Sequence, residues 1–147
     1  MLLDMIGRRI LVTGASRGIG RAVVSSFTKQ GGEVHYTHRG RSPDSILPRA
    51  ESEGGGSVTG HVLDMQDVGR LRAWFTAFTD TYGTVDVLVN NVGGPIRRSS
   101  FETSDLSLWQ QSFELNVLTA VATTQGVLPA LRAAAEAHGE ACIINIS

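Results

Sequence analysis

The stretch Thr13-Gly14-Ala15-Ser16-Arg17-Gly18-Ile19-Gly20 decides the fold of this chain because of the segments on either side of it. A short apolar run at 10–12 precedes it and predicts a buried strand. Apolar residues recur after it at helical spacing, up to a stop at Gly31-Gly32. A glycine turn between a strand and a helix presents backbone N–H groups and the positive end of the helix to an anion. The sequence therefore predicts a nucleotide phosphate site, with contacts at Gly14, Ser16, Arg17, Gly18, Ile19 and Gly20.

Strand and helix patterns alternate along the rest of the chain. We expect the five strands at 10–12, 34–37, 58–63, 85–89 and 141–146. We expect helices after the glycine turn, from Ser42 over a short stretch, at 68–82, and at 107–137 with Pro129 as a kink. Strands separated by helices pair in parallel through right-handed crossovers. The sequence thus predicts an α/β fold, a doubly wound, Rossmann-like parallel sheet of five strands, with residues 1–147 forming one nucleotide-binding domain.

Composition limits the partners and the compartment. The 147 residues carry a net charge of −1, and the sequence pI is about 6.4; neither favours nucleic acid or an acidic membrane surface. No apolar run approaches the roughly 20 residues that span a bilayer. The single cysteine, Cys142, excludes an internal disulfide, and its apolar neighbours predict a buried, inert thiol. No secretory signal is visible at residues 1–7, so we expect a cytoplasmic protein.

The end of the second strand predicts the choice of dinucleotide. An acidic residue there binds the ribose 2′-hydroxyl of NAD, whereas an arginine accommodates the 2′-phosphate of NADP. This chain has His38 and Arg39 and no carboxylate, and Arg17 adds a second positive charge. Two guanidinium groups near one phosphate favour NADP(H) as the cofactor, so residues 1–147 are expected to form a single NADP(H)-binding domain. The alternative interpretation is that Arg39 is a solvated loop residue.

Two more strand ends carry polar or small residues. Asp64 follows the third strand, where its carboxylate would accept a hydrogen bond from adenine or, equally well, cap a helix. The turn Asn91-Val92-Gly93 follows the fourth strand, and its small residues and backbone amides suit a nucleoside lying across the sheet edge. We therefore add Asp64, Asn91, Val92 and Gly93 to the expected dinucleotide contacts.

Together these stretches resemble the short-chain dehydrogenase/reductase family over essentially the whole chain. The resemblance is carried by the glycine turn, Asp64, 90–93, the pair Trp109 and Asn116, and 143–147, with Val92 in place of the family's usual alanine. It implies an NADP(H)-dependent carbonyl or alcohol oxidoreductase. It also implies that Asn116 holds a water in a catalytic proton relay. From the residues alone, Asn116 equally well bonds a neighbouring backbone group.

The reaction centre of the family is not found in these residues. The family uses a tyrosine acid with a lysine four residues later, and a serine that orients the substrate. The two tyrosines are followed at that distance by Gly40 and Asp86, and the only lysine is Lys29. Ser147 aligns with the first serine of the family's Asn-Ile-Ser-Ser motif, whose second serine is the functional one. We therefore expect a chain truncated before the catalytic residues, which does not transfer hydride alone.

Two alternatives from other functional classes remain. One is a non-catalytic module that binds a nucleotide or a partner protein. The other is an enzyme with different chemistry in the vacated cleft, built on Asn116, Ser147, Arg97 or a histidine; His35 and His61 lie on strands and read as core residues. In each case the last strand and the long helix leave apolar surface uncovered. We therefore expect a homodimer or higher oligomer.

Overall fold

The computed structural model describes residues 4–40 and 55–147. Along the chain, the elements in these ranges are β1 (Arg9–Val12), α1 (Gly18–Lys29), β2 (Glu33–His38), β3 (Ser57–Val62), α2 (Val68–Tyr82), β4 (Val87–Asn90), α3 (Leu106–Phe113), the π-helical turn η2 (Glu114–Leu118), α4 (Thr119–His138) and β5 (Cys142–Asn145). The helix expected to begin at Ser42 lies outside the described residues.

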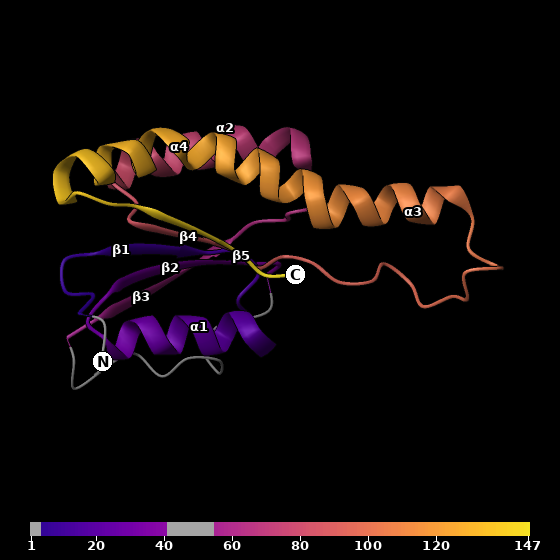
Figure 1. Cartoon of the computed structure of the whole chain (residues 1–147), viewed down its shortest axis with the longest axis horizontal. Helices are drawn as coiled ribbons and strands as arrows, with labels where there is room; N and C mark the ends of the chain where they lie inside the picture. Colours follow the sequence, from indigo (N-terminus) through magenta and orange to yellow (C-terminus); the bar gives the residue numbers. More distant parts are fainter. Residues whose placement is uncertain (1–3, 41–54) are drawn as a thin grey trace.

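The five strands form one parallel sheet in the order β3-β2-β1-β4-β5. Helix α1 covers one face of the sheet, and α2 and α4 lie side by side on the other (Figure 1). The predicted doubly wound α/β architecture is therefore confirmed. Because all strands run in the same direction, their carboxyl ends meet at one edge. At this edge the helices that follow β1 and β4 lie on opposite faces of the sheet. Ligands bind beside such a reversal of strand order in sheets of this kind.

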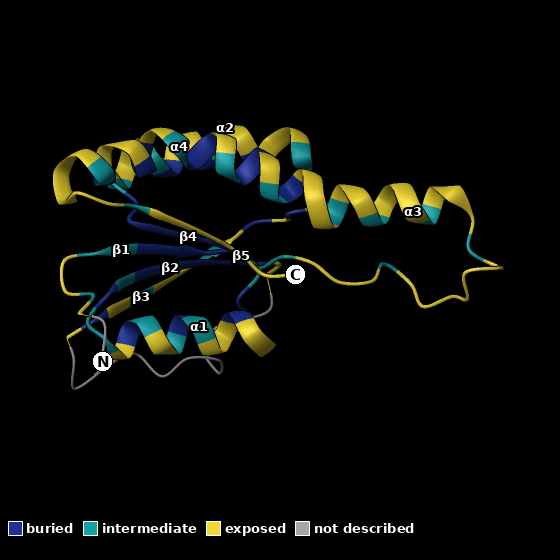
Figure 2. Cartoon of the chain, viewed as in Figure 1, coloured by how far each residue is buried: buried dark blue, intermediate teal, exposed yellow. Residues whose placement is uncertain are grey.

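The alternation of β1 divides the core into two layers. Leu11 points toward α2 and α4, whereas Ile10 and Val12 point toward α1. The first layer also contains Leu63, Leu71, Phe75, Leu88, Val127 and Leu131. The second also contains Val24, Val34 and Val89. Figure 2 shows the central strands buried, whereas α3 is mostly exposed. Burial from both faces explains why these strands read as short continuous apolar runs.

The long helix expected at 107–137 is a rod of three parts rather than one regular helix. Its middle, η2, has a wider π turn, where Asn116 Nδ2 donates to the carbonyl of Ser112 at 2.8 Å. One turn later, Thr119 Oγ1 donates to the carbonyl of Leu115 at 2.6 Å. Side-chain donors of this kind compete for the carbonyl groups of the preceding turn and distort a helix. Apolar periodicity does not report them.

The burial predicted for Cys142 is wrong, because its side chain is exposed. Strand β5 pairs only with β4 in the described residues, so all four of its residues are exposed. An apolar run predicts burial only when both edges of its strand are covered. None of the described helices is both long enough and apolar enough to cross a membrane.

At the amino edge of the sheet, the carboxylate of Asp86 joins three segments. It accepts hydrogen bonds from Arg8 Nη1 at 2.9 Å, the N–H of Arg9 at 2.8 Å and His138 Nδ1 at 2.6 Å. Burial alone would raise the pKa of Asp86, but the hydrogen bonds from Arg9, Arg8 and His138 outweigh it and hold the pKa below its usual value. His138, at the end of α4, thus ties this helix to the amino edge of the sheet.

Candidate nucleotide site

The glycine turn leaves β1 at the carboxyl edge of the sheet and leads directly into α1. Gly14 has a φ of +66°, which an L side chain rarely adopts, and a Cβ there would lie 2.6 Å from Cγ2 of Val92. Gly20 is buried against Ala15 and Asn91, and a Cβ there would overlap both. A side chain at either position would therefore displace the turn. The two glycines thus allow the turn to pack closely against the residues that follow β4.

Thr13 and Asn91 fasten the glycine turn to β4. Thr13 Oγ1 accepts the N–H groups of Asn91 at 3.0 Å and Val92 at 3.2 Å. In return, Asn91 Nδ2 donates to the carbonyl groups of Thr13 at 2.9 Å and Gly14 at 3.0 Å. Both amide hydrogens of Asn91 are therefore engaged with the backbone. Of the predicted contacts in this turn, Asn91 shapes the site, whereas Gly93 is exposed at its rim.

Thr37 fastens the same turn on the opposite side, to β2. Its Oγ1 accepts the N–H of Gly14 at 3.0 Å, and its carbonyl accepts the N–H of Ala15 at 3.1 Å. Thr37 itself is fully buried. The turn is thus held between the two strands that flank β1.

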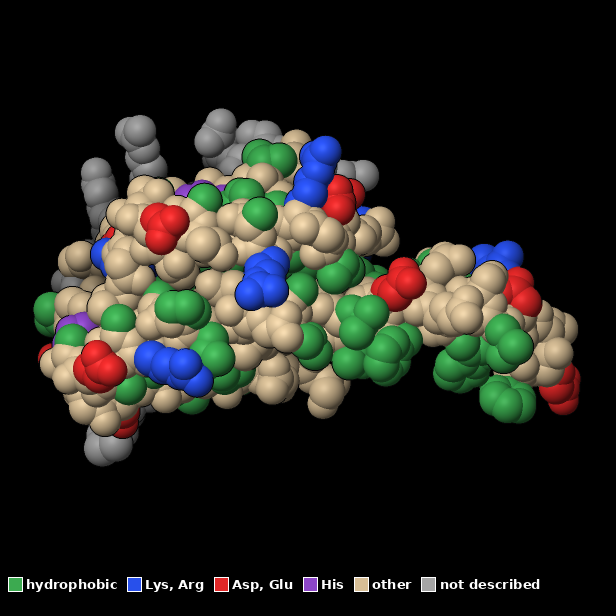
Figure 3. Space-filling view, turned by 90° about the horizontal axis from the view of Figure 1, so that it is seen from above, with side chains coloured by type: hydrophobic (Ala, Val, Ile, Leu, Met, Phe, Trp, Pro, Cys, Tyr) green, Lys and Arg blue, Asp and Glu red, His purple; other side chains and the backbone are tan. Residues whose placement is uncertain are grey.

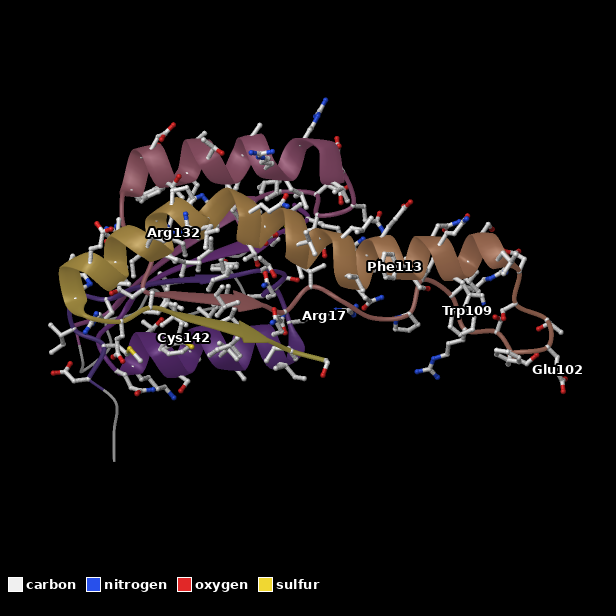
Figure 4. All side chains as sticks on the ribbon, turned by 45° about the horizontal axis from the view of Figure 1, so that its top comes forward. Arg17, Glu102, Trp109, Phe113, Arg132 and Cys142 are labelled. Carbon is white, nitrogen blue, oxygen red and sulfur yellow. The ribbon has the colours of Figure 1, made fainter. Side chains whose placement is uncertain are left out.

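The amino end of α1 is left open to solvent beyond this clamp. Arg17 caps the helix with an extended backbone, and its side chain makes no capping hydrogen bond. Figure 4 shows Arg17 close to the end of the sheet where the last strand finishes. Ile19, in the first turn, is 62% exposed. An open helix amino end next to a positive and an apolar side chain can hold a nucleotide phosphate.

The residues after β2 form a second polar corner of the same edge. His38 is buried, and its Nδ1 accepts the N–H of Gly40 at 3.2 Å. That contact fixes the turn that contains Arg39, whose side chain is exposed. The sequence interpretation of Arg39 as a phosphate ligand and the alternative of a solvated residue are both compatible with this position.

Asp64 lies beyond the end of β3, and it does not cap α2. Its Oδ1 accepts the N–H of Gln66 at 3.0 Å, while the residue at the helix cap is Asp67. The capping interpretation of Asp64 is therefore wrong. The carboxylate is exposed at the carboxyl edge of the sheet, and its predicted contact with adenine stays a prediction.

Asn116 binds the loop that follows β4. Its Oδ1 accepts the N–H of Gly94 at 2.7 Å, and its Nδ2 donates to the carbonyl of the same residue at 3.0 Å. With the bond to Ser112, three interactions of this side chain go to backbone groups. The structure thus shows the backbone-binding role that the residues alone allowed. The proton-relay role implied by the family stays a prediction.

His35 and His61, on neighbouring strands, form a cluster of their own with Glu33. His35 Nδ1 lies 3.0 Å from His61 Nε2, and His35 Nε2 lies 3.0 Å from Glu33 Oε1. Both rings pack against Phe78 and Tyr82 of α2. Burial lowers the pKa of His61 to about 4, with a smaller contribution from His35. The core role expected for these two histidines fits this environment.

Sequence reasoning missed the two threonines that hold the turn. Thr13 entered only as part of the quoted motif, and Thr37 only as a strand residue. A threonine at the end of a buried strand, beside a glycine turn, is a signal for side chain-to-backbone bonding. Which N–H groups it reaches depends on strand order, which becomes visible only in the fold.

The comparisons with known proteins place this geometry in a family. The family model for short chain dehydrogenases matches residues 8–147. The chain belongs to this family. A curated relative, a 7α-hydroxysteroid dehydrogenase of Bacteroides fragilis, is 29% identical over 140 residues, which cover 94% of this chain and 52% of the relative. This short chain dehydrogenase chain spans about half the length of the curated relatives that it matches.

Two solved structures of short chain dehydrogenase relatives contain different dinucleotides. The NADH-dependent reductase A1-R′ complexed with NAD is 30% identical, with a TM-score of 0.86, and the match covers 99% of this chain and 61% of the reductase. A metagenomic short-chain oxidoreductase in complex with NADP is 28% identical, with a TM-score of 0.81, and the match covers 99% and 64%. The fold is thus shared by relatives of both cofactor types.

Proposed function

We propose that this chain forms the dinucleotide-binding half of an NADP(H)-dependent carbonyl or alcohol oxidoreductase. The observation that carries the proposal is the glycine turn clamped between β2 and β4, which leaves the amino end of α1 open. Relatives with this fold include complexes with NAD and with NADP. The proposed contacts are those expected from the sequence, namely Gly14, Ser16, Arg17, Gly18, Ile19, Gly20, Arg39, Asp64, Asn91, Val92 and Gly93.

Each region of the site has a distinct task in this proposal. The amino end of α1 binds the diphosphate, and Asp64 accepts a hydrogen bond from the adenine amino group. Arg17 and Arg39 hold the 2′-phosphate. When bound, the nicotinamide supplies or accepts the hydride. Asn116 fixes the loop at Gly94, which borders the place where a nicotinamide would lie.

The preference for NADP(H) rests on charge at the end of β2. No carboxylate follows this strand directly, and Arg39 stands exposed there. Calorimetric titration of the chain with NADPH and NADH tests the preference. We expect NADPH to bind more tightly, and Arg39→Ala to reduce its affinity by about 1.5–3 kcal/mol, the value of a charge-assisted hydrogen bond. Equal binding of the two cofactors, or an unchanged ratio in Arg39→Ala, would contradict it.

Hydride transfer by these 147 residues alone is not expected, because they contain no Tyr-x-x-x-Lys pair. An assay of NADPH oxidation with a panel of ketones and aldehydes tests this. Binding without turnover supports the proposal, and also describes what a non-catalytic binding module would do. Turnover that Asn116→Ala abolishes would show instead that other residues supply the proton.

We further propose that the chain self-associates through its apolar surface. Trp109, Phe113, Val117 and Val121 follow one another at intervals of four residues along the rod and are 39–55% exposed. Figure 3 shows hydrophobic side chains gathered along this projecting part, and Figure 4 shows Trp109 and Phe113 away from the sheet. A two-fold pairing that covers them would bury more than about 1,200 Å² in total. Light scattering at micromolar concentration tests it; a folded monomer would contradict it.

A further inference from the structure

One buried residue of β2 accepts two consecutive N–H groups of the glycine turn. Thr37 receives the N–H of Gly14 on Oγ1 and the N–H of Ala15 on its carbonyl oxygen, at 3.0 and 3.1 Å. No part of its side chain reaches solvent. Both N–H groups therefore point into the sheet, toward β2, and are not available to an anion above the turn.

The next N–H groups of the turn are in a different situation. The N–H groups of Ser16 and Arg17 come just before α1, and those of Gly18 and Ile19 lie in its first turn, where a helix provides no carbonyl partner of its own. Thr37 thus separates the turn into two N–H groups that hold it and a following set that faces outward. Without the acceptor at Oγ1, the N–H of Gly14 would have to seek another partner, and the turn could rotate.

We propose that Thr37 is a positioning residue for the diphosphate, which sets the N–H groups of the turn that face it. This inference rests on the proposed dinucleotide function. The next two residues along the chain are His38, which fixes the following turn, and Arg39. One strand end therefore places both the diphosphate cradle and the arginine. Of Thr37 and Arg39, only Arg39 distinguishes NADPH from NADH.

Conservative substitutions separate a positioning role of Thr37 in ligand binding from a general effect on the folded structure. Thr37→Val keeps the shape of the side chain and removes the acceptor, and Thr37→Ser restores it. Thr28→Val is the matched control, because Thr28 is also buried and its hydroxyl bonds to the carbonyl of Val24, inside α1. ADP, NADPH and NADH are titrated into each variant by calorimetry.

We expect Thr37→Val to bind all three ligands about tenfold more weakly, by the same factor for each, which is the effect of one neutral hydrogen bond. Thr37→Ser should recover most of the affinity, and Thr28→Val should bind like the wild type. Wild-type ADP binding in Thr37→Val, or an equal loss in Thr28→Val, would overturn the inference. If the wild-type chain binds none of the three ligands, the proposed function itself fails.

Amide hydrogen exchange gives a second test. It uses only the wild-type chain, so it does not depend on whether a variant folds. The amides of Gly14 and Ala15 should exchange slowly without ligand, because Thr37 already holds them. The amides of residues 16–18 should exchange fast and become protected only when ADP is added. Fast exchange at Gly14 and Ala15 in the free chain, followed by protection with ADP, would assign them to the ligand and overturn the inference.

Discussion

The two outer strands of the sheet are built differently. Strand β3 carries polar or small residues at most of its positions, and its His61 lies against the rings of Trp74, Phe78 and Tyr82. Strand β5 instead carries two consecutive isoleucines, Ile143 and Ile144, that are more than one third exposed. On β3 the one exposed large apolar side chain is Val62, at the last position of the strand. A true edge avoids apolar exposure, because unpaired strands with apolar side chains associate. The composition of β5 is that of an interior strand.

The contrast extends to the helices beside each edge. On the β3 side, the aromatic residues of α2 close over the sheet. On the β5 side, α4 leads into the last strand, and Val121 on its surface is 46% exposed. Side chains of α2 thus pack over the β3 side, whereas the β5 side leaves several neighbouring apolar side chains exposed. The following predictions test that difference.

The largest effect is expected at Asp86, whose carboxylate ties α4 to the amino edge of the sheet. Asp86→Asn keeps the shape of the side chain but removes the charge that pairs with Arg8 and His138. We expect a loss of about 3 kcal/mol in the free energy of unfolding, near the lower end for breaking a buried ion pair, because both partners are partly exposed. Urea unfolding at pH 7 measures it, with Asp80→Asn on the surface of α2 as the control. A loss below about 1 kcal/mol would mean that the hydrogen bonds alone suffice.

The lowered pKa of Asp86 fixes the direction in which stability changes with pH. The pKa of Asp86 is lowered in the folded chain, so its contribution is present above the unfolded value and is lost as the pH falls through the folded one. In Asp86→Asn, the acid-side decline in stability below about pH 4 should therefore be shallower than in the wild type. An unchanged slope would contradict the assignment.

The next effect concerns association rather than folding. Val121→Lys places a charge within the apolar surface of the rod, where a paired copy would have to bury it. We expect the dimer to weaken by about 2 kcal/mol or roughly 30-fold, with little change in unfolding of the monomer. Thr59→Lys, on the polar β3 edge, is the matched control and should leave association unchanged. Sedimentation velocity over a concentration series measures both, and equal behaviour of the two variants would show that copies do not pair through the rod.

The sequence predicted the architecture because its signals are local. Apolar runs, helical spacing and glycine stops located all five strands within about two residues, and alternation alone implied parallel pairing. The prediction failed where the burial of a residue depends on which segment packs beside it. Cys142 was expected to be buried from its own apolar run, whereas its exposure is set by what pairs with β5.

The site shows the same division. The glycine turn could be predicted, since strand, turn and helix are consecutive in the chain. The π turn at Asn116 could not, because it coincides with a side-chain contact to the preceding carbonyl group. The clamp by Thr37 could not either, because it joins residues 23 positions apart that meet only once β1 and β2 pair in register. The capping interpretation of Asp64 failed because the cap of α2 is Asp67, three residues further along the chain.

A smaller effect is expected on the β3 side at mildly acidic pH. Burial lowers the pKa of His61 to about 4, so the unfolded chain binds a proton there between about pH 6.5 and 4 that the folded chain does not. Stability should therefore be full above pH 6.5 and fall as the pH drops toward 4, by about 1–2 kcal/mol once the partial exposure of the ring is allowed for. His61→Gln keeps a donor for His35 but does not titrate, and should flatten this range in urea unfolding. A parallel curve for the variant would assign the slope to other groups.

The smallest effect is expected at Cys142, and it reports on how the β5 edge is covered. Cys142→Ser should change the free energy of unfolding by less than about 0.5 kcal/mol, because the side chain is exposed. The thiol of the wild-type chain should react with a disulfide reagent nearly as fast in buffer as in denaturant. If copies pair through the helical rod, that rate stays constant as protein concentration rises. A rate that falls with concentration would show that copies pair through β5 instead, and would move the interface from the rod to the strand.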